Sequence, residues 1–432
     1  ERKMLILAAV FVLTVLLGVP VAVCLSLAGS AFILVTPGVQ FNMLPTLIFG
    51  GIDAFPLMAI PFFIMAGDMM NRSGVLPKLV DLADALVGHL KGGLAYVNIL
   101  ASMFFAGVTG VAVADTAAVG SMLIPTMVKQ GYTRRFSAVV TAASSIMGPI
   151  IPPSVAMLIY AHVYGGGISV AKLFLLGAVP GILIGVGMMG IVFFQSFSRN
   201  FPVSLDRGFS LSNVTRKFFA ALPGLMVPVI ILGGIIGGFF TPTEAGAVAV
   251  TYAVLVGLFV TRTLRLSDIP ACFIASCRTS AVVFLLLATA KVVSYILVSQ
   301  QVPQTVAGFF LQFTESAIVF LIFTIIFLLI VGFVLEAVAT MIMLIPVFGP
   351  VAVSFGIEPH LFGLIVVMTV QVALITPPVA LGLFICTPIA ECSIESATRE
   401  IWPFLFLVFG IILLVAFWPG ITTWVPELFG YR

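Results

Sequence analysis

Two short stretches of this sequence combine a carboxylate with small residues in a way that suits the passage of ions through a membrane. The first, GVTGVAVADTAAVG at residues 107–120, places Asp115 among glycines and threonines inside an apolar run. The second, GFVLEAVAT at residues 332–340, places Glu336 in a similar setting. Acidic residues are costly in hydrocarbon, so with small neighbours they mark either close helix packing or an ion path.

The two stretches occupy matching places in the two halves of the chain. Each runs into a Met-Leu-Ile-Pro motif, and aligning those motifs sets Asp115 opposite Glu336. Each is followed by a Pro-Pro break, GPIIPPS at residues 148–154 and ITPPVALG at residues 375–382. Interrupted hydrophobic segments at corresponding places in two halves indicate the binding site of a secondary transporter.

The composition is that of a polytopic membrane protein. Of the 432 residues, 61% are hydrophobic and 8% are charged, and the mean hydropathy is +1.28. Soluble domains do not bury so much apolar surface. The net charge of +3 gives no reason to expect a nucleic-acid partner. Five scattered cysteines and three isolated histidines predict neither a disulfide framework nor a metal cluster.

Hydropathy and helix breakers give the expected order of the spans. Residues 4–36 are interpreted as one span kinked at Pro20, a signal anchor rather than a cleaved signal peptide. Charged and apolar residues alternate at helical spacing over 72–91, which predicts an amphipathic helix at the membrane interface. The other simple spans are expected at 46–70, 168–195, 218–240, 244–261, 279–298 and 401–418, with a short arm at 302–313.

Four further segments are expected to be interrupted. The runs 93–128 and 316–351, each about 36 residues long, would overshoot a bilayer as single helices. They predict re-entrant hairpins with tips at Gly107 to Gly110 and near Gly332. The spans at 136–161 and 361–390 are expected to break at their Pro-Pro motifs.

The charge distribution orients these segments. If Arg2 and Lys3 are cytoplasmic, counting crossings puts 16 of the 19 Lys and Arg on that side, as the positive-inside rule requires. The same count makes the first hairpin enter from the cytoplasm and the second from outside. The expected protein is therefore all-α, with inverted repeats, its amino terminus inside and its carboxyl terminus outside.

The hairpin tips and the Pro-Pro breaks predict ion sites. A sodium ion crossing the midplane needs protein oxygens in place of water, and unwound backbone supplies carbonyl oxygens. The helix after each tip also directs its positive N-terminal end toward the midplane, which favours an anionic substrate. The candidate ligands are Thr109, Gly110, Gly148, Ile151 and Pro153 in the first half, Gly332, Phe333, Thr376 and Val379 in the second, and Asp115 and Glu336 beside the tips.

Other interpretations compete with an ion site. Gly-xxx-Gly spacing often reflects close helix packing, and Asp115 and Glu336 can hydrogen-bond to tip amides instead of an ion. Lys291, inside an apolar segment, suits snorkelling or a structural ion pair. An intramembrane enzyme would need a catalytic set such as Ser with Lys or a His-Glu-x-x-His helix, which the sequence lacks. A channel is disfavoured because broken hairpins in inverted halves suit alternating access.

At these residues the chain resembles the large membrane subunit of tripartite ATP-independent periplasmic (TRAP) transporters. The glycine-rich first tip, the GPIIPPS break, the Thr-Pro-Pro before Gly382 and the run PFFIMAGDMM at 61–70 carry a resemblance that covers essentially the whole chain. It implies sodium-coupled import of an organic acid by an elevator mechanism in the bacterial inner membrane. It also implies two partners, a small four-helix membrane subunit and a periplasmic substrate-binding protein.

The resemblance implies at least two sodium ions and their ligands. The family usually has serine at the positions of Thr109 and Val111, so Val111 can offer only its carbonyl here. It usually has aspartate at the position of Glu336, whose side chain is one methylene longer. The implied first site uses Thr109, Val111, Gly148, Ile151 and Pro153, and the second uses Gly332, Glu336, Thr376 and Val379.

The resemblance also divides the chain into a scaffold and a transport domain that holds both hairpins. The expected transport domain comprises 93–167 and 316–390, followed by a C-terminal helix in 391–432. The expected scaffold comprises 1–45, 46–92 with the interfacial arm, 168–278, and 279–315 with the second arm. The alternative function is a stand-alone sodium-coupled dicarboxylate or citrate carrier. No residue decides among dicarboxylates, sialic acid, other sugar acids, keto acids and sulfonates.

Overall fold

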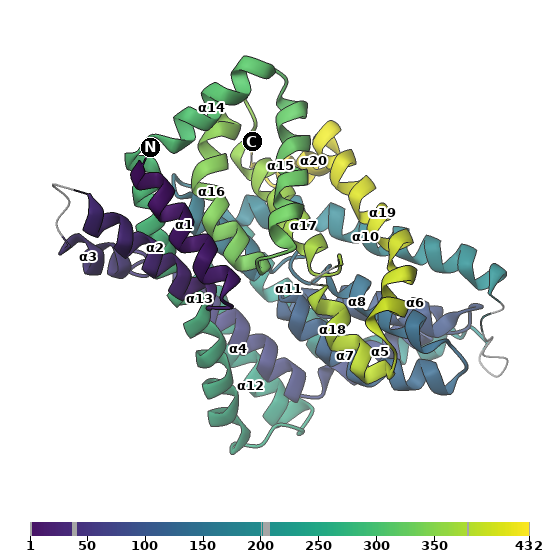
Figure 1. Cartoon of the computed structure of the whole chain (residues 1–432). Coiled ribbons are helices and arrows are strands. Elements are labelled where there is room, and N and C mark those ends of the chain that lie inside the picture. The colour runs from purple at the N-terminus through teal and green to yellow at the C-terminus, as the bar shows by residue number, and fades with distance from the viewer. Residues whose placement is uncertain (1, 37–40, 200, 202–207, 378–379, 432) are drawn as a thin grey trace.

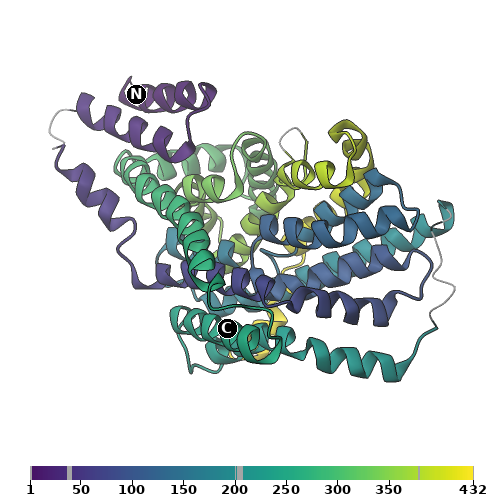
Figure 2. The ribbon, with the colours of Figure 1, turned by 90° about the horizontal axis from the view of Figure 1, so that it is seen from below.

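The described part of the chain is all helical (Figures 1 and 2). The structure is a computed structural model that describes residues 2–36, 41–199, 201, 208–377 and 380–431. In this part of the chain six helices are long and apolar enough to cross a membrane, or seven if one bent pair counts as a span. The prediction of a polytopic all-α membrane protein is confirmed. The six helices are Val170–Ser198, Leu211–Ile236, Pro242–Val260, Asp268–Ser299, Ala337–Ser354 and Ile394–Phe417.

The amino-terminal segment reverses direction instead of forming one kinked span. Helix α1 (Arg2–Leu16) ends before Gly18, which adopts φ +75°, and Pro20 then precedes α2 (Val21–Val35). Figures 1 and 2 show α1 and α2 side by side and antiparallel. A left-handed glycine ends a helix, and a proline two residues later cannot continue it. The prediction of a single span over 4–36 is therefore wrong.

This reversal changes the count of crossings. At 15 residues each, α1 and α2 are about 22 Å long. Because they are antiparallel, Lys3 and Thr36 lie at the same end of the pair. The placement of the amino terminus in the cytoplasm assumed a single crossing here, so that assignment loses its basis.

The next elements lead to the first hairpin. Helix α3 (Met43–Gly50) meets the 3₁₀ turn η1 (Phe55–Met58) and α4 (Ala59–Arg72) at a bend of 56°, so the predicted span 46–70 is broken. The predicted amphipathic helix is α5 (Val75–Val87), whose apolar face is buried against neighbouring helices that include α6 and α11.

The first hairpin and its broken partner follow the predicted boundaries. Helices α6 (Gly93–Thr109) and α7 (Ala112–Lys129) meet at Gly110, and α8 (Arg134–Ser145) is separated from α9 (Val155–Tyr164) by non-helical backbone. The predicted breaks at the first glycine cluster and the first Pro-Pro motif are confirmed.

Long helices connect the two halves. They are α10 (Val170–Ser198), α11 (Leu211–Ile236), α12 (Pro242–Leu255) with the π turn η2 (Val256–Val260), and α13 (Asp268–Ser299). Helix α13 begins eleven residues before the predicted start at 279, because the polar segment expected to be a loop is helical from Asp268 onward.

The second half contains the second hairpin and break. The arm α14 (Val302–Phe313) has the predicted bounds, and the hairpin helices α15 (Ala317–Gly332) and α16 (Ala337–Ser354) are separated near Gly332 as predicted. Helices α17 (Pro359–Ala373) and α18 (Leu381–Ala390) flank the second Pro-Pro motif. Helix α19 (Ile394–Phe417) begins before the predicted residue 401, and α20 (Gly420–Leu428) was not predicted.

A polar cluster joins the start of α10 to the start of α17. Lys172 Nζ lies 3.3 Å from Glu358 Oε1, and His360 Nδ1 lies 2.5 Å from the same oxygen. His360 Nε2 accepts from the Ser169 amide at 3.0 Å, while Glu358 caps α17 by accepting from the Leu361 amide at 2.8 Å. Burial opposes ionisation of Glu358, but these donors outweigh it and lower its pKa to about 2.

Cysteines replacing Lys3 and Thr36 are expected to be labelled from the same side of the membrane, because α1 and α2 are antiparallel. A membrane-impermeant maleimide applied to intact and permeabilised cells measures this, in a background where the exposed Cys277 is serine. A cysteine replacing Leu17 marks the other end of the pair. Labelling of positions 3 and 36 from opposite sides would restore the single span.

Glu358→Gln is expected to lower stability at neutral pH by about 1 kcal/mol, a value discounted because the side chain is 42% exposed. A depressed pKa contributes stability above the ordinary value of 4.5, and this contribution is lost as the pH falls toward 2. The difference in melting temperature between Glu358→Gln and the parent should therefore shrink from pH 7 to pH 3. Glu315→Gln, at an exposed glutamate, is the control. A difference independent of pH would contradict the assignment.

Candidate functional site

The first hairpin tip meets the first break through backbone atoms. Gly110, with φ +64°, ends α6, and its carbonyl accepts from the Val155 amide at 3.4 Å. A Cβ on Gly110 would lie 2.5 Å from the Pro153 carbonyl oxygen, and one on Gly67 of α4 would lie 3.2 Å from Thr109 Cα. Glycine is therefore required at Gly110 both by its dihedral angle and by the close approach of another backbone.

Asp115 is enclosed behind this tip. It lies in the first turn of α7 with 0% of its surface exposed, and its Oδ1 accepts from the Thr109 hydroxyl. Its Oδ2 has no hydrogen-bond partner among the described residues, and a Cβ on Gly148 would collide with that oxygen. A buried carboxylate oxygen without a donor is costly, so it calls for a cation or a proton.

The first break supplies unpaired carbonyl oxygens near this carboxylate. Ser154 caps α9 through the Met157 amide and also donates to the Pro149 carbonyl. In the described part of the chain, no hydrogen bond reaches the carbonyl oxygens of Gly148, Ile151 or Pro153. These are three of the ligands predicted from the sequence.

The second tip is built differently. A Cβ on Gly332 would lie 2.5 Å from Ala373 Cβ, so α15 packs on the end of α17 through side-chain carbon. Phe333 caps the carboxyl end of α15, and Thr376 is buried and donates to the Val372 carbonyl at 2.7 Å. The predicted ligand Val379 lies outside the described residues.

The two acids that the motif alignment pairs occupy different positions. Asp115 lies three residues after the start of α7, whereas Glu336 precedes α16 and is its N-cap, accepting from the Ala339 amide at 3.4 Å. Asp115 is fully buried, whereas Glu336 is exposed on the wall of a cavity. Asp115 and Glu336 therefore align in the sequence but differ in their structural surroundings.

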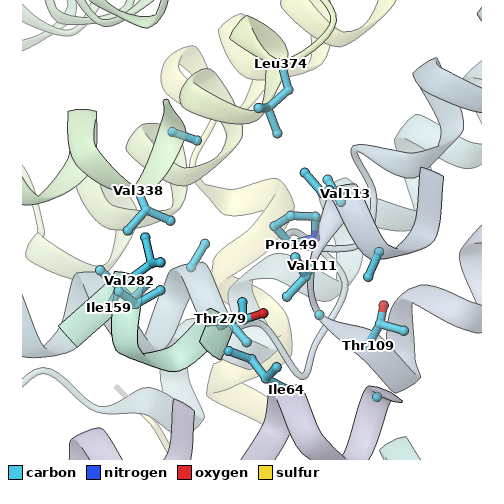
Figure 3. A pocket seen from close by; sticks show the side chains of 18 of the residues that line it. Ile64, Thr109, Val111, Val113, Pro149, Ile159, Thr279, Val282, Val338 and Leu374 are labelled. Atoms are coloured by element: carbon cyan, nitrogen blue, oxygen red, sulfur yellow. The ribbon is translucent and has the colours of Figure 1, made fainter. Parts of the chain in front are cut away.

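That cavity has a volume of about 570 Å³ and lies where both hairpins meet the long helices. Figure 3 shows Val338 and Val282 facing Val111 and Val113 across it, with Leu374 from the second break above. Of the predicted ligands, Thr109, Gly110, Val111 and Glu336 line it, whereas Asp115, Gly148, Ile151, Pro153, Gly332, Phe333 and Thr376 do not.

Several polar residues in the wall were missed from the sequence. Asp68 and Asn71 come from α4, Arg278 and Thr279 from α13, and Gln371 from the last turn of α17. The sequence offered one signal, since PFFIMAGDMM at 61–70 was part of the family resemblance. Arg278 lies just before the span expected at 279–298, in a segment that the structure shows as part of α13.

The first turns of α7 and α16 both line this cavity, through Ala112 to Ala114 and through Ala337 and Val338. Helix α16 is capped by Glu336, but the N-cap of α7, Val111, provides no side-chain acceptor. Uncapped amides and the helix dipole make such an end attractive to an anion.

Paired hairpins and broken helices around one cavity define a polytopic membrane transport protein. The family described as tripartite ATP-independent periplasmic transporter, DctM component, matches residues 7–421. The chain belongs to this family. It is a transporter permease component, in a family that is not enzymatic and that works with a substrate-binding protein and a small subunit.

Three relatives show the range of the family. The sialic acid large permease protein SiaM of Vibrio cholerae is 36% identical over 96% of this chain and 96% of its own length. The C4-dicarboxylate large permease protein DctM of Pseudomonas aeruginosa is 36% identical over 94% of both. The isethionate permease protein DctMQ of Oleidesulfovibrio alaskensis is 36% identical over 96% of this chain, which spans 65% of that longer protein.

Two solved structures share the fold. The Alcanivorax borkumensis YdaH transporter aligns with a TM-score of 0.61 at 15% identity, covering 96% of this chain and 98% of its own. Neisseria gonorrhoeae MtrF aligns with a TM-score of 0.62 at 12% identity, covering 87% of this chain and 83% of its own. At these identities the likeness concerns the fold alone.

Gly148→Ala is expected to destabilise the protein by about 1–3 kcal/mol, because the new methyl group displaces the Asp115 carboxylate from its enclosure. The melting temperature of the purified protein measures this. Gly190→Ala in α10, where no atom lies within 4 Å of the new Cβ, is the matched control and should be neutral or slightly stabilising. Equal stability of Gly148→Ala and the parent would show that Asp115 is not confined by Gly148.

Proposed function

We propose that this chain is the large membrane subunit of a sodium-coupled importer of a small organic acid. The observation that carries the proposal is the Asp115 Oδ2 oxygen, which is buried without a partner among the described residues and lies where a Cβ on Gly148 would collide with it. The carbonyls of Gly148, Ile151 and Pro153 in the adjoining break also have no hydrogen-bond donor among the described residues. Carboxylate and carbonyl oxygens around a fixed backbone are what a sodium ion needs to shed its water.

The first sodium site in this proposal uses the first tip and the first break. Thr109 and Asp115 are already joined by a hydrogen bond, so the hydroxyl orients the carboxylate. The Val111 carbonyl accepts from the Asp115 amide at 3.2 Å and keeps one lone pair for an ion. The remaining ligands are the carbonyls of Gly110, Gly148, Ile151 and Pro153.

The second sodium site is proposed at the second tip, from Gly332, Phe333, Glu336, Thr376 and Val379. Glu336 caps α16 through one oxygen, Oε2, and lines the cavity. Its carboxylate is therefore within reach of an ion entering from the cavity. Two sodium ions would neutralise the negative charges of Asp115 and Glu336. A different cationic group would then bind the anionic substrate.

Packing supports a division into moving and fixed parts. Helices α10 and α19 pack against each other. Helix α10 also packs on α6 and α17, and α19 also packs on α8 and α18, all of which belong to the hairpins or the broken helices. We therefore include both in the transport domain, beyond its predicted bounds. Helix α13 packs on α2 and α4, and α4 on α12, which suits a scaffold. The cavity lies between these groups, where an elevator mechanism requires the substrate.

The names of the relatives guide the proposed partners and location. Transport of sialic acid, C4-dicarboxylates and isethionate by related permeases suggests a small carboxylate or sulfonate. The proposed partners are a four-helix membrane subunit and a periplasmic binding protein, in the bacterial inner membrane. With α1 and α2 antiparallel and the 72–91 segment kept in the cytoplasm, both termini are proposed to lie in the periplasm. The alternative is a stand-alone sodium-coupled carrier.

Uptake into proteoliposomes tests the proposal. The chain is reconstituted with a small subunit and assayed with radiolabelled organic acids, with and without a sodium gradient and binding protein. Uptake that needs both supports the tripartite transporter, and uptake with sodium alone supports the stand-alone carrier. Uptake indifferent to sodium would reject the coupling.

Asp115→Asn is expected to lower sodium-driven uptake by at least tenfold while the protein remains in the membrane, because the amide carries no charge for the ion. The sodium concentration needed for half-maximal uptake should rise. Glu315→Asn, at an exposed position outside the tips, should behave like the parent. Normal uptake by Asp115→Asn would reduce this carboxylate to a structural role.

A further inference from the structure

We propose that the cavity selects a carboxylic acid with an apolar body, such as a branched 2-oxo acid, and that Arg278 holds its acid group while Gln371 meets a second polar atom. This rests on the proposed function and deepens it by naming the substrate class. It follows from which groups in the wall are free and which are already engaged.

Arg278 is the only basic residue among the described residues that line the cavity. Its side chain is exposed on α13, and it makes no ion pair within the described part of the chain. An unpaired guanidinium presents several donors in a planar fork that matches a carboxylate. It faces a cavity that the uncapped first turn of α7 also lines, so two features of the wall favour an anion.

Four other polar side chains in the wall already have partners. Asp68 accepts from Ser276 at 3.0 Å, and Thr279 donates to the Ala275 carbonyl at 3.2 Å. Thr109 donates to Asp115, and Glu336 caps α16. Besides Arg278, two wall amides, Asn71 and Gln371, have no hydrogen-bond partner through their side chains among the described residues.

Of these two amides, Gln371 is the buried one. It is 3% exposed, and its Oε1 has no hydrogen-bond partner among the described residues. A buried amide without a partner costs about 1–3 kcal/mol, so its place in a cavity wall indicates a ligand group. A primary amide can donate to a keto oxygen or accept from a hydroxyl. One such group on the substrate is what this wall can satisfy.

The rest of the wall is apolar. It is formed mainly by aliphatic side chains with one aromatic, among them Ile64, Phe105, Val111, Val282, Val338 and Leu374. An acid with many hydroxyls would leave several of them without partners in this volume, each at a cost in affinity. A hydrocarbon body gains from the same surface. The wall therefore favours 4-methyl-2-oxopentanoate over a sugar acid.

Protection of an introduced cysteine measures binding without the selectivity of a binding protein. Thr279→Cys places a thiol in the wall, in a background where Cys277 is serine, and a maleimide labels it in the purified membrane complex with sodium. 4-Methyl-2-oxopentanoate should protect at a concentration about tenfold below that of N-acetylneuraminate or succinate. The neutral 4-methylpentanamide should not protect at the concentration where the acid does.

Two arginine variants test the anion contact. Arg278→Gln in this background should raise the half-protecting concentration of 4-methyl-2-oxopentanoate by about tenfold. The value for Arg278→Lys should lie between those of the parent and Arg278→Gln. Arg265→Gln removes an equal charge from a residue outside the cavity wall and should change nothing. Gln371→Leu, a change to a side chain of similar volume, should raise the half-protecting concentration of the 2-oxo acid. It should not change that of 4-methylpentanoate, which lacks the keto group.

The outcomes separate this inference from the proposed function. The inference alone is overturned if uptake is driven by sodium but a sugar acid protects better than the 2-oxo acid. It is also overturned if uptake is driven by sodium but Arg278→Gln and Arg265→Gln have the same half-protecting concentration. If no acid protects and none is taken up, the cavity is not an organic-acid site, and both are overturned.

Discussion

The buried carboxylate of Asp115 is the constraint on which the first half of this fold depends. In hydrocarbon it is tolerable only if its oxygens are engaged, and Thr109 engages one of them. Thr109 and Asp115 lie on the two sides of the turn at Gly110, and the break approaches the turn at Pro153 and the carboxylate at Gly148. The carboxylate, the tip and the break therefore form one unit, and a change in any of them reaches the others.

The cavity depends on that unit and on elements distant in sequence. Its wall combines the two hairpins with α4 and α13, so no single segment contains the site. The wall is largely apolar, with Phe105, Val282 and Leu374 among its residues. A few polar groups provide its charge and its hydrogen bonds, as is usual in a small-molecule site.

Local chemistry made parts of this structure predictable. The turn at Gly110 and the Pro-Pro breaks follow from residues that cannot continue a helix, so their positions could be inferred from the sequence alone. The arm 302–313 was found because a proline begins it and polar residues bound it. The family of the chain followed from the same motifs.

The rest depended on contacts that a sequence does not display. Gly18 and Pro20 suit either a kink or a reversal, and packing of α1 on α2 gives the reversal. The segment before residue 279 looked polar enough for a loop, yet it continues α13 and brings Arg278 to the cavity. Gln371 gave no local signal, because its significance comes from a buried Oε1 that has no partner in the described part of the chain.

The two tips differ in what must be broken to separate them from their neighbours. Parting the first tip from its break disrupts a backbone hydrogen bond between Gly110 and Val155. Parting the second, at Gly332, disrupts a methyl-sized apolar contact with Ala373. The contact described at the first tip is therefore directional, whereas the contact described at the second tip is apolar and has no directional preference. Although the two halves follow similar sequence plans, their tips are therefore fixed in place by different kinds of interaction.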